Sequence, residues 1–212
     1  MSKPLYIFSG LGADERIFQR LDFSDSPANF IQWIAPEPDE AIEHYAQRLL
    51  AQIKTENPVL IGLSFGGMMA VEVAKLIRTE RIILISSAKT KAELPPYFQA
   101  GSFQLHHIIP ATFFKSSNPI SNWLFGADAP ADKKLLKQIL KDTDPIFLKW
   151  AMDKIASWKN HTVPNNIIHI HGTNDRILPI KYVRCDKTIQ NGGHMMVWNR
   201  AEELNDLLRK YL

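Results

Sequence analysis

A chain of 212 residues, 45% of them hydrophobic and 22% charged, has the composition of an ordinary globular protein. Its length suffices for one hydrophobic core with an inserted subdomain, and hardly for two independent cores. The net charge of +3 is small and the basic residues are scattered along the sequence, which argues against nucleic acid or a membrane surface as a partner.

Apolar runs of strand length recur along the chain, and each ends at a turn signal. They predict strands at residues 5–8, 30–34, 59–63, 81–85, 167–171 and 187–190. Apolar residues at helical spacing predict helices over 42–53, 68–77 and 201–208. The alternation of strands and helices is typical of an α/β fold, with a mostly parallel sheet of about six strands and helices on both faces.

The stretch between Ser87 and Ile167 interrupts this alternation. It is several times longer than one crossover needs and holds about half of the aromatic residues. Apolar residues from Leu135 to Leu140 predict one helix, and Asp144-Pro145 predicts the start of another, with the acid as its N-cap. We therefore expect a helical cap insert at residues 88–160, lying over one edge of a core made of residues 1–87 and 161–212.

The motif with the clearest chemical meaning is Gly62-Leu63-Ser64-Phe65-Gly66, a G-x-S-x-G sequence between a predicted strand and a predicted helix. A serine on so tight a turn is strained, and the chain passes close to itself at the two flanking glycines, where a β-carbon would collide. The alternative is an ordinary turn in which the serine caps the helix. The strand-to-helix setting favours Ser64 as a nucleophile.

A serine hydroxyl needs a neighbouring base to become a good nucleophile. Among the seven histidines, His194 follows the last predicted strand, at the sheet edge where catalytic groups of open α/β sheets gather. Its alternative is a loop histidine exposed to solvent. We expect His169 and His171 to be structural, although His171 at the strand's end is a candidate neighbour of the site. For His106 and His107, packing or solvent exposure is favoured over substrate contact.

The histidine in turn needs an acid that orients its ring and stabilises its protonated form. Asp175 lies on a loop at the same sheet edge, past the strand that ends at His171. The rival position, after Ile85, offers no carboxylate. Asp175 is therefore favoured over an ordinary turn aspartate, and the order Ser, Asp, His along the chain is one that this triad adopts.

The sequence resembles the α/β-hydrolase family over nearly its whole length. The resemblance rests on Phe8-Ser9-Gly10-Leu11-Gly12, on Gly62 to Gly67, on His171-Gly172-Thr173-Asn174-Asp175 and on Gly193-His194. It implies that the amides of Leu11 and Phe65 form an oxyanion hole and that the insert roofs an acyl or alcohol pocket.

The chain also departs from the family pattern. It opens on what would be the third strand, so the fold is expected to lack the N-terminal hairpin. The loop after Trp33 lacks the usual Asp-x-x-Gly-x-Gly sequence. The interval between Asp175 and His194 is short, which predicts a crossover trimmed to a turn near residues 180–182.

These residues predict acyl transfer to water, with Ser64, His194 and Asp175 as the catalytic residues. The expected substrate is a small to medium, largely apolar ester or thioester. Two alternatives stay open: a lyase, C–C hydrolase or perhydrolase-like activity that uses the same triad, and a ligand-binding protein built on the same fold. No cluster has the spacing of metal ligands, so neither a metal nor another cofactor is expected.

The remaining expectations concern the surroundings of the protein. A single cysteine, Cys185, excludes a disulfide framework and fits a reducing compartment. No secretory signal begins the sequence, and no apolar run approaches the roughly 20 residues that cross a bilayer. We expect a cytoplasmic monomer or homodimer that acts on a small-molecule acyl substrate, with no nucleic-acid or membrane partner.

Overall fold

The structure is a computed structural model, and it describes residues 3–99 and 118–212. In these residues the centre of the molecule is a six-stranded sheet in the order β2-β1-β3-β4-β5-β6. All neighbouring strands run parallel. The strands are β1 (Leu5–Phe8), β2 (Ala28–Phe30), β3 (Val59–Leu63), β4 (Arg81–Ile85), β5 (Ile167–Gly172) and β6 (Lys187–Ile189). The predicted fold class is confirmed.

The second strand differs from its prediction. The apolar run predicted a strand at 30–34, whereas β2 ends at Phe30, which pairs with Ile7 near the end of β1. Past this point the backbone N–H of Gln32 donates to the Gln52 side chain instead of to a strand. Trp33 and its neighbour Ile34 then pack against the core beside the sheet. Ile31 still donates its N–H to the Ile7 carbonyl at 2.9 Å, so burial without strand pairing accounts for the apolar character of Trp33 and Ile34 alone.

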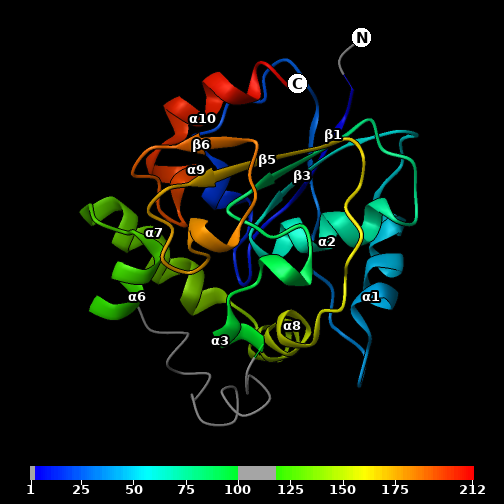
Figure 1. Cartoon of the computed structure of the whole chain (residues 1–212), viewed down its shortest axis with the longest axis horizontal. Coiled ribbons are helices and arrows are strands. Elements are labelled where there is room, and N and C mark those ends of the chain that lie inside the picture. Colours follow the sequence, from blue (N-terminus) through cyan, green and yellow to red (C-terminus); the bar gives the residue numbers. More distant parts are fainter. Residues whose placement is uncertain (1–2, 100–117) are drawn as a thin grey trace.

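Helices cover both faces of the sheet (Figure 1). On one face lie α1 (Ile42–Leu49) and α2 (Phe65–Ala74), and on the other lie α9 (Met196–Asn199) and α10 (Ala201–Leu208). Single turns of 3-10 helix occur at Glu15–Phe18, Leu50–Gln52, Lys91–Glu93 and Ile180–Tyr182. The last of these is the short crossover predicted between Asp175 and His194. The helix predicted over 42–53 is interrupted, because its last turn tightens into the 3-10 form after Leu49.

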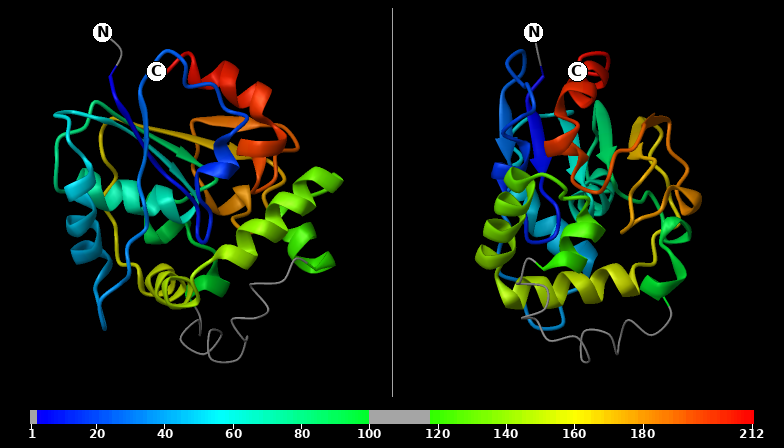
Figure 2. Two further views of the ribbon diagram at one scale, coloured as in Figure 1. Left: turned by 180° about the vertical axis from the view of Figure 1, so that it is seen from behind. Right: turned by 90° about the vertical axis from the view of Figure 1, so that its left-hand side faces the viewer.

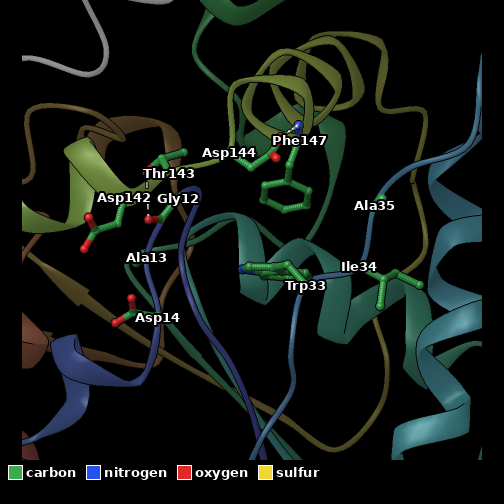
Figure 3. Close-up of a pocket in the computed structure, with 10 residues that line it drawn as sticks. All are labelled: Gly12, Ala13, Asp14, Trp33, Ile34, Ala35, Asp142, Thr143, Asp144 and Phe147. Carbon is green, nitrogen blue, oxygen red and sulfur yellow. Dashed lines mark hydrogen bonds between the residues drawn. The ribbon is translucent and has the colours of Figure 1, made fainter.

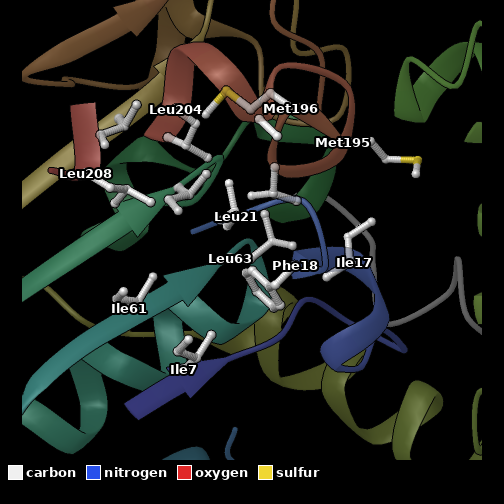
Figure 4. Close-up of a cluster of buried hydrophobic side chains, with 14 of the residues drawn as sticks. Ile7, Ile17, Phe18, Leu21, Ile61, Leu63, Met195, Met196, Leu204 and Leu208 are labelled. Atoms are coloured by element: carbon white, nitrogen blue, oxygen red, sulfur yellow. The ribbon is translucent and has the colours of Figure 1, made fainter. Parts of the chain in front are cut away.

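Each face carries its own hydrophobic cluster, because side chains alternate between the two sides of a strand. Figure 4 shows the cluster on the α10 side, where Ile7, Ile61 and Leu63 of the strands meet Leu204 and Leu208 of the last helix. The strand residues between them point to the opposite cluster, against α1 and α2. The last residues of these strands, which lead into the loops at the carboxyl edge of the sheet, are thus anchored in the core.

Between β4 and β5 the described residues form helices and no strand. These helices are α3 (Pro96–Gln99), α6 (Pro119–Phe125), α7 (Pro130–Asp142) and α8 (Pro145–Ser157). Figures 1 and 2 show them beyond the end of the sheet that faces away from the two chain termini. As predicted, Asp144 caps α8 by accepting the N–H groups of Ile146 and Phe147. His106 and His107 lie outside the described residues, and the bounds of the cap stay a prediction.

Helix α8 is tied to the core by two indole hydrogen bonds. The Nε1 of Trp158 donates to Glu72 Oε1 on α2 at 2.7 Å, and that of Trp150 donates to the carbonyl of Glu40 at 2.9 Å. Both indoles are buried. Since α2 begins directly after Ser64, the Trp158 bond ties the insert to the helix that follows the serine, and the Trp150 bond ties it to the turn before α1. Among the described helices, none has the length and apolar character needed to span a membrane.

Candidate active site

Three side chains form one hydrogen-bonded chain at the carboxyl ends of the strands. Ser64 follows β3, Asp175 follows β5 and His194 follows β6. His194 Nε2 lies 2.9 Å from Ser64 Oγ, and its Nδ1 lies 2.8 Å from Asp175 Oδ2. A carboxylate accepts, so Nδ1 carries the proton and Nε2 is free to accept from the serine hydroxyl. The structure therefore brings together the three residues that the sequence predicted to interact.

The backbone of Ser64 is strained, as expected for a nucleophile on a tight turn. Its φ is 52° and its ψ is −121°, a region that costs a residue with a side chain about 1–3 kcal/mol. A β-carbon on Gly66 would lie 2.2 Å from the carbonyl oxygen of Ser9, and one on Gly62 would lie 2.4 Å from Gly67 Cα. The close approach predicted at both flanking glycines is confirmed.

The end of β4 supports this turn. The Ser64 N–H donates to the carbonyl of Ile85 at 2.9 Å, and the Ser87 hydroxyl donates to the Ser64 carbonyl at 2.6 Å. The loop after Ile85 was the rival position for the acid. Instead of a carboxylate it provides a hydrogen bond that holds the strained serine in place.

Asp175 is a buried and fully partnered carboxylate. Its side chain is 0% exposed, and its Oδ1 accepts the N–H groups of Ile177 and Leu178, both at 2.9 Å. Burial pushes the pKa of Asp175 upward, but the attraction of His194 and these hydrogen bonds outweigh it and hold the pKa below the ordinary value. The group is therefore an anion at neutral pH, as the acid of a triad must be to stabilise an imidazolium.

The loops of the acid and the base are bonded to each other. Thr173 N–H donates to the carbonyl of Ile189, and Asn174 N–H donates to that of Gly192. In return, Asn191 N–H donates to the Thr173 hydroxyl at 2.8 Å. These bonds fix the distance between the two loops, and so they hold Asp175 against the histidine ring.

The helical insert also contacts His194. His194 is buried, with 6% of its surface exposed, so it is not the solvent-exposed loop histidine of the alternative. The ring of Phe125, at the end of α6, meets the His194 ring edge-on at 5.8 Å between centroids. The carbonyl of Phe125 accepts the N–H of Met195. A residue of the predicted cap thus packs directly on the imidazole, and no pattern in the sequence indicates this contact.

The loop after β1 passes beside the nucleophile. A β-carbon on Gly10 would lie 3.6 Å from Ser64 Cβ, and the Ser9 hydroxyl braces the loop by donating to the Ala13 carbonyl at 2.6 Å. Within the described residues, neither the N–H of Leu11 nor that of Phe65 donates a hydrogen bond. Two free amides on the elements that flank Ser64 agree with the expected oxyanion hole, and their role stays a prediction.

A cavity of about 240 Å³ lies between this loop and the junction of α7 and α8. Figure 3 shows Trp33 and Phe147 on one side of it, and their rings stack at 5.2 Å between centroids. Asp144 and Gly12 also line the cavity. Phe65, next to the serine, touches both rings. None of Ser64, Asp175 and His194 lines this cavity; its link to them runs through Phe65.

One group of three side chains in the described residues has the spacing to hold a metal ion. Ligand atoms of Glu37, Glu40 and His44 lie within 4.8 Å of one another. The buried Glu40 carboxylate, however, already accepts from Arg48 at 2.8 Å and lies 2.8 Å from His44 Nδ1. These partners compensate the buried charge of Glu40, so an ion-pair network with Arg48 and His44 explains the cluster. The one signal of this network in the sequence is the four-residue spacing of Glu40 and His44, which is too common to predict it.

Comparisons with known proteins agree with this architecture. The model of the alpha/beta hydrolase family matches residues 8–207. A hydrolase from Oleispira antarctica is 14% identical with a TM-score of 0.76, covering 100% of this chain and 91% of that one. An esterase from Exiguobacterium antarcticum is 14% identical with a TM-score of 0.71, covering 99% and 91%. A lipase-esterase related protein from Clostridium acetobutylicum is 16% identical with a TM-score of 0.72, covering 99% and 94%. At these identities the likeness shows the fold. No curated protein matches the chain.

We expect Gly66→Ala to destabilise the protein by about 3 kcal/mol, because the new β-carbon would meet backbone oxygens that cannot rotate away. Chemical denaturation of the purified protein measures this change. Gly10→Ala is the matched control: its β-carbon would find its nearest neighbour at 3.6 Å, and we expect a change below about 1 kcal/mol. Equal effects of the two substitutions would contradict the close approach described for the turn.

Proposed function

The chain belongs to the alpha/beta hydrolase family, and we propose that it is a serine hydrolase that cleaves a small to medium, largely apolar ester or thioester. The observation that carries this proposal is the continuous chain from Asp175 through His194 to Ser64, with contacts of 2.8 and 2.9 Å. Such an arrangement removes the proton from a serine hydroxyl as the hydroxyl attacks a carbonyl.

In the first half of the proposed reaction, Ser64 Oγ attacks the carbonyl carbon and its proton passes to His194 Nε2. Asp175 stabilises the resulting imidazolium, and the N–H groups of Leu11 and Phe65 bind the oxyanion. When the tetrahedral intermediate collapses, His194 gives the proton to the leaving alcohol or thiol. The product of this half is an acyl ester of Ser64.

In the second half, His194 removes a proton from a water molecule that attacks the acyl carbon. Collapse of the second tetrahedral intermediate returns the proton to Ser64 Oγ and releases a carboxylic acid. The same histidine thus acts twice as base and twice as acid, and the reaction needs no second general acid or base.

The cavity lined by Trp33 and Phe147, whose rings contact Phe65 next to the serine, supports the proposed substrate class. Its volume of about 240 Å³ fits a short acyl or alcohol group, and the stacked rings of Trp33 and Phe147 give it an apolar wall. Two of the similar structures are named as an esterase and as a lipase-esterase related protein, which favours an ester among the bonds that this triad can cleave.

We expect one covalent adduct when the wild type reacts with a small fluorophosphonate, because only an activated serine attacks phosphorus at a useful rate. Intact-mass spectrometry measures the adduct. Ser64→Ala should take no label. Ser157→Ala, which changes an exposed serine at the end of α8, is the control and should be labelled like the wild type. An unlabelled wild type, or a labelled Ser64→Ala variant, would contradict the proposed nucleophile.

The aromatic wall predicts a preference among acyl chain lengths. We expect Phe147→Ala to raise the ratio of kcat/KM for long over short p-nitrophenyl esters by about 10-fold, because the enlarged cavity accepts further methylene groups. A ratio of substrates does not depend on the fraction of folded enzyme. Phe23→Ala, on the opposite face of the sheet, should leave the ratio unchanged. If Phe147→Ala leaves it unchanged as well, the cavity does not hold the acyl chain.

A further inference from the structure

A second buried histidine braces the loop that carries the acid. His171 lies on β5, four residues before Asp175, and its side chain is 0% exposed. Its Nε2 lies 2.7 Å from the carbonyl oxygen of Leu178 and 3.7 Å from Asp175 Oδ2. Leu178 in turn donates its backbone N–H to Asp175 Oδ1 at 2.9 Å. The ring, the loop and the carboxylate therefore form one closed set of contacts.

The protonation of this ring follows from its partners. A carbonyl oxygen only accepts, so Nε2 carries the proton and donates it to Leu178. The positive end of the neutral ring's dipole thus faces the Asp175 carboxylate. Burial lowers the pKa of His171 below its ordinary value, against the opposing attraction of Asp175. At neutral pH the ring carries no charge, so of the two histidines that contact Asp175 in the described residues, His194 is the one whose protonated form the carboxylate stabilises.

Packing alone gives no reason for a histidine at this position. The Nδ1 of His171 is buried without a hydrogen-bond partner among the described residues. An apolar side chain at this position would have no polar atom to leave unpartnered. The neighbouring His169 lies on the same face of β5, with its ring 5.3 Å from that of His171. Neither ring nitrogen of His169 has a hydrogen-bond partner in the described part of the chain. Of these two rings, that of His171 is the one within hydrogen-bond distance of the acid loop.

We propose that His171 is a positioning residue of the hydrolytic site, whose N–H holds Leu178 and thereby keeps the Asp175 carboxylate aimed at His194. This inference rests on the proposed function. It assigns to His171 no contact with the substrate and no proton transfer. Its effect on the reaction passes through the placement of Asp175, so loss of the hydrogen bond should lower kcat and leave KM nearly unchanged.

The test compares two substitutions of similar size and polarity. The amide nitrogen in His171→Gln reaches the place of Nε2 and can donate to Leu178, whereas that in His171→Asn is one methylene short. Activity is expressed per Ser64 that takes a fluorophosphonate label, so that misfolded protein is not counted. We expect His171→Asn to lower kcat about 10- to 100-fold, the size of effect caused by a small misplacement of a catalytic group. His171→Gln should stay within about threefold of the wild type, as one hydrogen bond is regained.

Two further variants complete the test. His171→Leu removes the hydrogen-bond donor and puts no amide in its place, so its kcat should fall as in the Asn variant. If one of these two variants does not fold, the other still tests the inference. His169→Asn makes the same substitution in the adjacent buried ring and should keep full activity per labelled serine. The inference would be overturned if the Asn, Gln and Leu variants at position 171 all kept the kcat of the wild type and differed from it only in a lower thermal midpoint. That result would leave the proposed hydrolase function standing. A wild type that takes no label would overturn the proposed function and this inference with it.

Discussion

The site depends on a single charge held out of water, the carboxylate of Asp175. A buried carboxylate is unfavourable unless hydrogen bonds and an opposite charge compensate it. Here the loop amides of Ile177 and Leu178 occupy one oxygen, and His194 occupies the other. Because the anion is fixed in this way, it fixes the tautomer and orientation of the His194 ring. The free nitrogen of that ring then meets the Ser64 hydroxyl.

The strain at Ser64 and the contacts of the insert serve the same geometry. The unfavourable φ of the serine is held by hydrogen bonds from the neighbouring strand end. On the other side, Phe125 of α6 lies edge-on against the imidazole, and Trp158 ties α8 to the helix that follows the serine. The insert is therefore part of the support for the proposed base and nucleophile, His194 and Ser64.

Much of this arrangement was predictable from local sequence. The buried strands, the G-x-S-x-G turn and the loop positions of Asp175 and His194 follow from patterns a few residues long, and parallel strands bring their carboxyl ends to one edge. The prediction for β2 was wrong because apolar character does not reveal where β1 ends and pairing stops. Contacts of Phe125 with His194, and of His171 with Leu178, depend on how loops fold back. No periodicity in the sequence encodes them.

The most direct test of this account is the turnover of Asp175→Asn. The amide keeps the size of the side chain, but it removes the charge and no longer fixes the histidine tautomer. We predict that kcat for a reactive ester falls about 10,000-fold while the variant remains folded by circular dichroism. A folded Asp175→Asn enzyme that keeps kcat within about 10-fold of the wild type would contradict the claim that this buried charge organises the site.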